Sequence, residues 1–298
     1  MENMKKEIIN KAKNHGLILD ETTIEFANIG LDFQVAFGTD QQGTKWVLRL
    51  PRRKDAFLKT KKEKQTLDLL HKASLPFEVP IWEIYSEELI GYQILSGEPA
   101  VTTDSETQEN HWVFDEKDVP EIFTQSLGQA LATLHSIPIK SELKDGAPSE
   151  KLKTAMSQRM DVVKESYAIN DELWLRWQRW LENDDLWPQE VGFIHGDLYP
   201  GHMLIDEDFS VTGIIDWTEA KVSDVSNDFT AHYMLFGEEE LEKLILAYQK
   251  AGGYTWPKMK EHIIELLATQ AITLAEFAES SGIDDYKEIA KEMLKNGH

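Results

Sequence analysis

Three polar side chains in one stretch of the sequence have the types and the spacing needed for phosphoryl transfer. Asp197 follows His195 and Gly196, His202 comes five residues after Asp197, and Asp216 directly follows two isoleucines. One carboxylate can orient a hydroxyl nucleophile, while a second carboxylate and an imidazole can hold Mg²⁺ against a triphosphate. A turn residue and a strand cap would explain two aspartates, but would require neither histidine. We therefore expect Asp197 to be catalytic and His202 and Asp216 to bind the metal ion.

The composition narrows the classes of protein to which the chain can belong. Its 298 residues suffice for one two-lobed unit with a large core. A formal net charge of −22 argues against a nucleic-acid partner, whose phosphates would be repelled. The chain has no cysteine, and it lacks both a signal-peptide-like start and a run of about 20 apolar residues. We expect a cytoplasmic protein with no membrane partner.

The first third of the chain is rich in short segments with β-branched and aromatic residues. These segments predict a small antiparallel sheet, with a helix before it and a long charged helix after the third strand. The expected strands are residues 23–29, 33–39, 45–50, 81–85 and 89–95, and the expected helices are residues 5–15 and 55–73. The last strand runs into Ser96-Gly-Glu-Pro99, which is typical of a hinge. We therefore expect two lobes, residues 1–95 and 96–298.

The second part of the chain has helical periodicity around the polar stretch described above. We expect residues 100–111 to form a polar loop and His135, on the first helix after it, to be structural. Trp174, Trp177 and Trp180 recur every three residues, which favours core packing. The expected helices are residues 118–137, those beginning near 149, 170 and 229, and residues 238–251, 256–280 and 284–294. The fold class is thus α+β.

With these residues in hand, the chain resembles the antibiotic phosphotransferases, which have a protein-kinase-like fold. It is most similar to the macrolide 2′-phosphotransferase branch. The motifs that carry the resemblance are Gly30-Leu-Asp-Phe-Gln-Val35, Trp46-Val-Leu-Arg-Leu-Pro-Arg-Arg53, His195-Gly-Asp-Leu-Tyr-Pro-Gly-His202 and Ile215-Asp-Trp-Thr-Glu-Ala220. Aminoglycoside kinases usually have asparagine where His202 stands, whereas the macrolide branch has histidine there. The chain departs from the branch at Tyr199, where a second histidine is frequent.

The resemblance implies a bilobal fold, with a small antiparallel sheet and one helix in the N-lobe and a larger helical C-lobe. It also implies roles for particular residues. Arg49 stands at the position of the kinase strand lysine, where it would steady the phosphates with support from Glu63. The alternative for Arg49 is an exposed position on an edge strand. The alternative for Glu63 is a solvated helix face, because it lies in a highly charged run. The backbone of Ile94 and Leu95 would bind the purine, and relatives of this type favour GTP over ATP.

The implied substrate is a macrolide, a large apolar ring that carries a cationic dimethylamino sugar. Its pocket requires apolar area and a few acids, and we expect Asp228, Tyr233 and Phe236 to contribute. Asp197 would orient the 2′-hydroxyl group of that sugar, and the protein would act as a monomer. Two alternatives remain open at this point. One is a kinase for another cationic molecule, such as an aminoglycoside or choline, and the other is an inactive kinase-like binding module.

Overall fold

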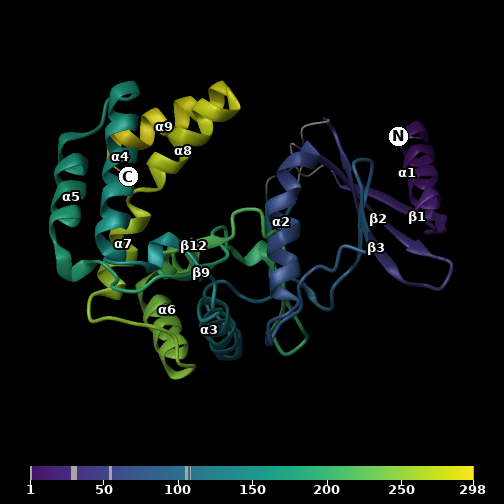
Figure 1. Ribbon diagram of the computed structural model, residues 1–298, viewed down its shortest axis with the longest axis horizontal. Coiled ribbons are helices and arrows are strands. Elements are labelled where there is room, and N and C mark those ends of the chain that lie inside the picture. Colours follow the sequence, from purple (N-terminus) through teal and green to yellow (C-terminus); the bar gives the residue numbers. More distant parts are fainter. Residues whose placement is uncertain (1, 28–31, 54–55, 105–106, 108, 298) are drawn as a thin grey trace. The chain divides into compact units, whose positions relative to one another are not determined.

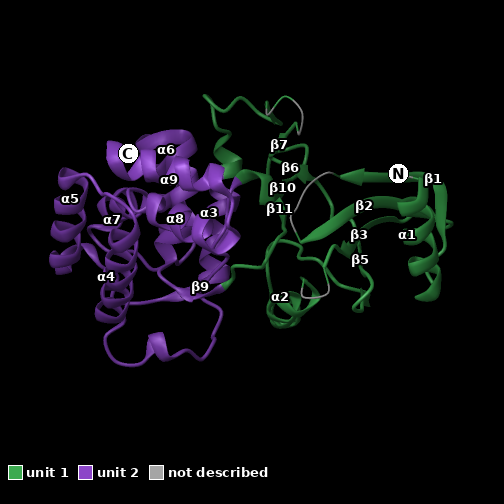
Figure 2. Cartoon of the chain, turned by 90° about the horizontal axis from the view of Figure 1, so that it is seen from above, with its two compact units in different colours: residues 1–123, 200–220 green, residues 124–199, 221–298 purple. Residues whose placement is uncertain are grey.

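The computed structural model describes residues 2–27, 32–53, 56–104, 107 and 109–297. Residues 28–31, which include Gly30 of the Gly30–Val35 motif, lie outside the described residues. The chain forms two compact units, Met1–Phe123 with Pro200–Ala220, and Thr124–Tyr199 with Lys221–His298 (Figure 2). The expected lobe boundary between residues 95 and 96 is a different division of the chain, and it stays a prediction.

The first unit contains an antiparallel five-stranded sheet with the strand order β1-β2-β3-β5-β4, of which Figure 1 labels β1, β2 and β3. Its strands are β1 (Leu19–Ala27), β2 (Phe33–Asp40), β3 (Lys45–Pro51), β4 (Ile84–Tyr85) and β5 (Ile90–Gln93). The turn between β2 and β3 is closed by the Asp40 side chain, which accepts hydrogen bonds from the Gln42 and Thr44 amides and the Trp46 indole. This small antiparallel sheet was predicted from the alternating segments.

Two helices of the first unit accompany this sheet. Helix α1 (Glu2–Asn14) buries Ile8 and Ala12 in one cluster with Trp46 and Leu48 of β3. Helix α2 (Ala56–Leu70) contributes Glu63, whose carboxylate meets Arg49 of β3. Successive side chains of a strand point to opposite faces, so Leu48 and Arg49 face opposite sides of the sheet. The apolar face of β3 therefore packs on α1, and its charged face meets α2.

A second, three-stranded sheet of the first unit positions His202 and Asp216. It consists of β6 (Glu98–Pro99), β10 (Met203–Ile205) and β11 (Val211–Ile214), in the order β11-β10-β6. The one-turn helix η3 (Pro200–His202) leads into β10, and Asp216 lies just after β11. Because β10 and β11 are antiparallel with Met203 opposite Ile214, the two ends that carry His202 and Asp216 lie together. The Ile215 amide donates to the His202 carbonyl oxygen at 3.0 Å.

The segment expected to be a loop between residues 100 and 111 is in fact paired. Strands β7 (Val101–Thr103) and β8 (Asn110–Trp112) form an antiparallel two-stranded sheet. The Thr103 hydroxyl donates to the Asn110 side-chain oxygen at 2.7 Å. The polar composition of this segment concealed the strands, because Val101 is buried but the other five residues of the two strands are exposed or half-buried.

The second unit is mainly helical. Its helices are α3 (Glu121–His135), which begins at the end of the first unit, α4 (Pro148–Ser166), α5 (Asp171–Glu182), α6 (Thr230–Lys250), α7 (Met259–Leu267), α8 (Gln270–Ser281) and α9 (Asp284–Asn296). Trp177 and Trp180 are fully buried in a core cluster, as the spacing predicted. The single helix expected over residues 256–280 is interrupted at Thr269, whose hydroxyl donates to the Leu266 carbonyl oxygen. Within the described residues, no helix is both long and apolar enough to span a membrane.

Candidate active site

The loop that carries Asp197 is fixed by the carboxylate of Asp228. Strand β9 (Gly192–Ile194) pairs with β12 (Lys221–Ser223), and the loop begins directly after β9. The two Asp228 carboxylate oxygens accept hydrogen bonds from the His195 and Gly196 amides, both at 2.8 Å. Gly196 has a φ of +86°, which glycine adopts at little cost. The backbone on either side of Gly196, which leads into Asp197, is therefore held by hydrogen bonds to Asp228.

Asp228 in turn belongs to a buried polar network. His135 Nε2 lies 3.1 Å from Asp228 Oδ2, and His135 Nδ1 lies 3.0 Å from the Tyr248 hydroxyl. Burial would raise the pKa of Asp228, but the hydrogen bond and charge of His135 and the loop amides outweigh it, so the pKa is lowered. Asp228 is 1 % exposed. A buried carboxylate with several donors stays ionised, and it can therefore hold the loop at neutral pH.

The side chain of Asp197 is exposed and that of His195 is fully buried. The Asp197 amide donates to His195 Nδ1 at 3.2 Å. Because an acceptor nitrogen carries no proton, this bond assigns the imidazole proton to Nε2. The histidine of the His-Gly-Asp sequence thus shapes the loop from inside, while the aspartate is presented outward.

His202 and Asp216 lie together in the first unit, as the spacing predicted. His202 Nε2 is 3.7 Å from Asp216 Oδ2. Asp216 adopts the left-handed conformation with a φ of +64°, which aspartate tolerates better than most residues. The other carboxylate oxygen, Oδ1, accepts a hydrogen bond from the Thr218 hydroxyl at 2.8 Å.

These two side chains fit an Mg²⁺ ion of the nucleotide-dependent kind. Among the described residues there is no group of three or more histidine, aspartate or glutamate side chains able to hold a metal. Mg²⁺ commonly takes one or two carboxylates from the protein and completes its six positions with phosphate oxygens and water. Asp216 meets that requirement. The His202 imidazole is the softer ligand of the two, so Asp216 would be the stronger.

Arg49 is enclosed on several sides. Its Nη1 donates to both Glu63 carboxylate oxygens, at 3.0 and 3.2 Å. The guanidinium carbon lies 4.7 Å from the centre of the Phe33 ring and 5.5 Å from that of Trp82. A planar guanidinium stacks on aromatic faces in a way that an ammonium group does not. The pairing of Arg49 with Glu63 implied by the resemblance is therefore present, whereas its nucleotide-binding role stays a prediction.

Burial and charge act on this pair in opposite directions. Burial raises the pKa of Glu63, and the neighbouring Arg49 charge offsets this effect only in part. Burial alone would lower the pKa of Arg49, but the negative charge of Glu63 outweighs it, so the guanidinium stays charged. Burial also raises the pKa of Tyr92 to about 12, so its hydroxyl remains neutral beside them. The pair thus offers a fixed cation on the α2 face of the sheet.

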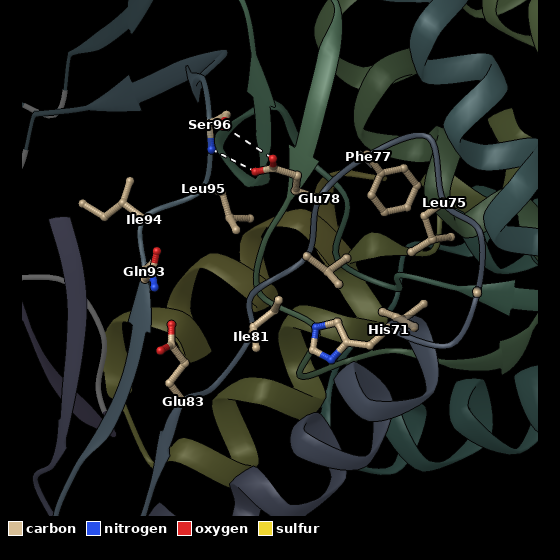
Figure 3. A pocket seen from close by; sticks show the side chains of 13 residues that line it. His71, Leu75, Phe77, Glu78, Ile81, Glu83, Gln93, Ile94, Leu95 and Ser96 are labelled. Atoms are coloured by element: carbon tan, nitrogen blue, oxygen red, sulfur yellow. Dashed lines mark hydrogen bonds between the residues drawn. The ribbon is translucent and has the colours of Figure 1, made fainter. Parts of the chain in front are cut away.

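Ile94 and Leu95 lie just after β5 and line a cavity of about 510 Å³ (Figure 3). Gln93 and Glu78 also line the cavity. The Glu78 carboxylate accepts a hydrogen bond from the Ser96 amide at 3.0 Å. Side chains alternate along β5, so Gln93 points away from the face on which Tyr92 approaches Arg49. The cavity is also lined by Leu70, the last residue of α2, and by His71 just after it. The expected contact between the backbone here and a purine stays a prediction.

The three residues expected to contact the substrate belong to the second unit. Asp228 is buried under the Asp197 loop, so its carboxylate serves as an internal anchor, which the sequence did not indicate. Tyr233 and Phe236 are half-buried on the first part of α6, which bends at Gly237. Their neighbours Met234 and Leu235 are exposed, so this segment presents apolar surface. Contact of Tyr233 and Phe236 with a substrate remains a prediction.

Some supporting contacts of the site were not predicted from the sequence. Asp228 was expected to contact the substrate, but no pattern connected it to the Asp197 loop more than thirty positions earlier. Phe33 and Trp82 read as ordinary strand residues. Thr218 stood inside a quoted motif without an assigned role. For Thr218 a usable signal existed, because a hydroxyl two residues after an aspartate is placed to hydrogen-bond to it.

The predicted residues are divided between the two compact units. Arg49, Glu63, the hinge residues, His202 and Asp216 belong to the first unit, and Asp197 belongs to the second. Asp197 precedes His202 by only five residues, so the chain passes from one unit to the other within the motif itself.

Comparison with known proteins gives a consistent result. An uncharacterized protein of Bacillus subtilis (strain 168), YcbJ, is 38% identical over 291 residues, which are 97% of this chain and 95% of that protein. The solved structure of a type I macrolide 2′-phosphotransferase is 38% identical, with a TM-score of 0.87 and coverage of 97% of this chain and 96% of the other. That of macrolide 2′-phosphotransferase MphH from Brachybacterium faecium, an apoenzyme, is 32% identical, with a TM-score of 0.88 and 97% coverage of both chains.

The model of the phosphotransferase enzyme family matches residues 23–262. This span begins in β1 and ends in α7, so it includes Arg49, Glu63 and the whole stretch from Asp197 to Asp216. The ion pair on the sheet, the histidine–aspartate pair at the end of the second sheet and the anchored Asp197 loop all lie within the matched span. The chain belongs to the phosphotransferase enzyme family.

Proposed function

We propose that the protein is a macrolide 2′-phosphotransferase that transfers the γ-phosphate of a nucleoside triphosphate to the 2′-hydroxyl group of a macrolide amino sugar. The observation that carries this proposal is the similarity to two macrolide 2′-phosphotransferases, at 38% and 32% identity over 97% of the chain. Identity of this extent along the whole chain favours a shared substrate class over a shared fold alone.

Asp197 would be the catalytic residue. Its carboxylate is exposed and its backbone is fixed by Asp228, so it can accept a hydrogen bond from the sugar hydroxyl without rearrangement of the loop. Phosphoryl transfer requires little covalent help from the protein and depends mainly on positioning and charge. The role of Asp197 is accordingly to orient the nucleophilic oxygen and to receive its proton.

The phosphates would be held by the first unit. Arg49 offers a fixed guanidinium that Glu63, Phe33 and Trp82 keep in place. His202 and Asp216 would hold Mg²⁺, which when bound neutralises phosphate charge and fixes the triphosphate. A related aminoglycoside 2′-phosphotransferase with 18% identity and the same fold is solved with GDP, which supports a nucleotide donor. We propose GTP as the preferred donor, with ATP as the alternative.

The macrolide would be bound by the second unit. Tyr233 and Phe236, with the exposed Met234 and Leu235, supply apolar area on α6. The net charge of −22 favours a cationic ligand over an anionic one. A macrolide combines both requirements, since its ring is apolar and its dimethylamino group is positively charged at neutral pH.

The decisive experiment measures nucleotide consumption with erythromycin, kanamycin and choline side by side, each with GTP and with ATP. We expect turnover with erythromycin and faster turnover with GTP. Turnover only with kanamycin or choline would refute the substrate class, and no phosphorylated product at all would indicate a binding module. Asp197→Ala should reduce turnover by at least about 10³-fold and leave nucleotide binding within about twofold. Near-normal activity of this variant would contradict its role.

A further inference from the structure

Thr218 lies between the predicted metal-binding pair and helix α2. Its hydroxyl donates to Asp216 Oδ1 at 2.8 Å. Its carbonyl oxygen accepts a hydrogen bond from Lys62 Nζ of α2 at 3.4 Å. Its hydroxyl also lies close enough to Glu63 to lower the pKa of that carboxyl group. The residue thus contacts both the metal-binding loop and the helix that supports Arg49.

The two oxygens of Asp216 have different surroundings. Oδ1 is engaged by Thr218, whereas Oδ2 faces His202 Nε2 at 3.7 Å. The hydrogen bond from the Thr218 hydroxyl to Oδ1 restrains the rotation of the carboxylate about its bond to Cβ. That rotation directs Oδ2 toward His202, where a shared cation would be held.

The backbone of Asp216 increases the need for such a restraint. Its φ of +64° is a conformation that non-glycine residues seldom adopt. The Asp216 side chain is 49% exposed. A side chain that exposed has little packing around it to fix its rotamer. The hydrogen bond from the Thr218 hydroxyl therefore restrains the rotamer of this exposed carboxylate.

We propose that Thr218 is a positioning residue, which orients the Asp216 carboxylate so that Oδ2 faces His202 and which ties this loop to α2. The proposal rests on the metal-binding role of His202 and Asp216 in the proposed function. Thr218 is assigned no direct contact with the metal or the substrate. It acts through Asp216, so its loss weakens metal binding while nucleotide binding without metal is retained.

The test compares Thr218→Val, which removes the hydroxyl at nearly constant shape, with Thr218→Ser, which keeps it. Mn²⁺ binding is measured by electron paramagnetic resonance in the presence of a saturating non-hydrolysable GTP analogue. Binding of a fluorescent GTP analogue is measured in EDTA. Thr218→Val should weaken Mn²⁺ binding by about tenfold, the effect of one lost hydrogen bond to a charged group. Thr218→Ser should stay within about twofold of the parent, as should both variants in EDTA.

Thr212→Val is the matched control, because the Thr212 hydroxyl donates only to backbone oxygens of Ser96 and Leu204 in the same unit. It should leave Mn²⁺ binding within about twofold. Asp216→Asn separates this inference from the proposed function. If Asp216→Asn weakens Mn²⁺ binding and Thr218→Val does not, the role of Thr218 is refuted alone. If Asp216→Asn has no effect, the metal site and the role of Thr218 both fail.

Discussion

The buried ion pair of Arg49 and Glu63 allows a prediction in which two opposing effects can be weighed. At 3.0 Å, the attraction between the two charges amounts to about 5–6 kcal/mol at an effective dielectric constant of about 20. Removal of a carboxylate from water costs several kcal/mol, and Glu63 is the more deeply buried partner, at 5% side-chain exposure against 18% for Arg49. For Glu63 the cost of burial outweighs the attraction, because burial raises its pKa despite Arg49, whereas for Arg49 the attraction outweighs burial.

The two single variants should therefore differ in stability. Glu63→Gln removes the buried charge and keeps an acceptor for Arg49, whose guanidinium retains the Phe33 and Trp82 rings. We expect its free energy of unfolding at pH 7 to stay within about 1 kcal/mol of the parent, or to rise slightly. Arg49→Met leaves Glu63 buried without a cation and should lower the free energy of unfolding by about 3 kcal/mol. Both variants should weaken binding of the triphosphate.

The assay is urea unfolding followed by circular dichroism, at pH values from 4 to 8. A raised folded pKa means that the folded state binds the proton more tightly, so the contribution of Glu63 falls as pH rises above the ordinary carboxyl pKa. Glu63→Gln should remove this slope. Glu239→Gln is the control, because Glu239 pairs with Lys243 at 86% side-chain exposure, and it should change stability by less than about 0.5 kcal/mol. Equal losses of stability in Glu63→Gln and Arg49→Met would refute the reasoning.

Three further predictions concern the second unit. Burial lowers the pKa of His232 from 6.5 to about 4. The contribution of this histidine to the free energy of unfolding should therefore be fully present above pH 6.5, and up to about 3 kcal/mol should be lost as pH drops toward 4. In urea titrations, His232→Gln should flatten this loss, while His111→Gln, at an exposed position, should not. Asp228→Asn places an amide donor against an amide of the Asp197 loop, so it should lower the free energy of unfolding by at least about 2 kcal/mol and reduce turnover. If neither value changes, Asp228 does not anchor the loop. Gly128→Ala would bring a methyl group 2.7 Å from Ala247 Cβ and from the Tyr248 nitrogen, so thermal melting should show a loss of about 1–3 kcal/mol where an open helical position would gain.

Much of the local structure follows from periodicity along the chain. The strands of the five-stranded sheet alternate in type, and the tryptophans of α5 recur at helical spacing, so both were predicted and are present. The pairing of β7 with β8 was missed, since its polar residues resemble those of a loop. The break at Thr269 was missed because a hydroxyl that bonds to the preceding turn leaves no periodic trace.

The sequence by itself determined which chemical groups are available. The order and spacing of Asp197, His202 and Asp216 indicated phosphoryl transfer, because one carboxylate can orient a hydroxyl nucleophile while the other two side chains hold Mg²⁺ against a triphosphate. The proximity of His202 and Asp216 was also foreseeable, because two antiparallel strands joined by a short turn bring their outer ends together.

The tertiary structure alone decided what holds these groups. Asp228 meets the Asp197 loop from more than thirty residues away. Phe33, at the start of β2, and Trp82, two residues before β4, lie against the Arg49 guanidinium. Such contacts depend on how the elements pack, and packing involves side chains with no fixed separation along the chain. A pattern of neighbouring residues therefore predicts the reacting groups, whereas the supports that orient them emerge only when distant segments meet.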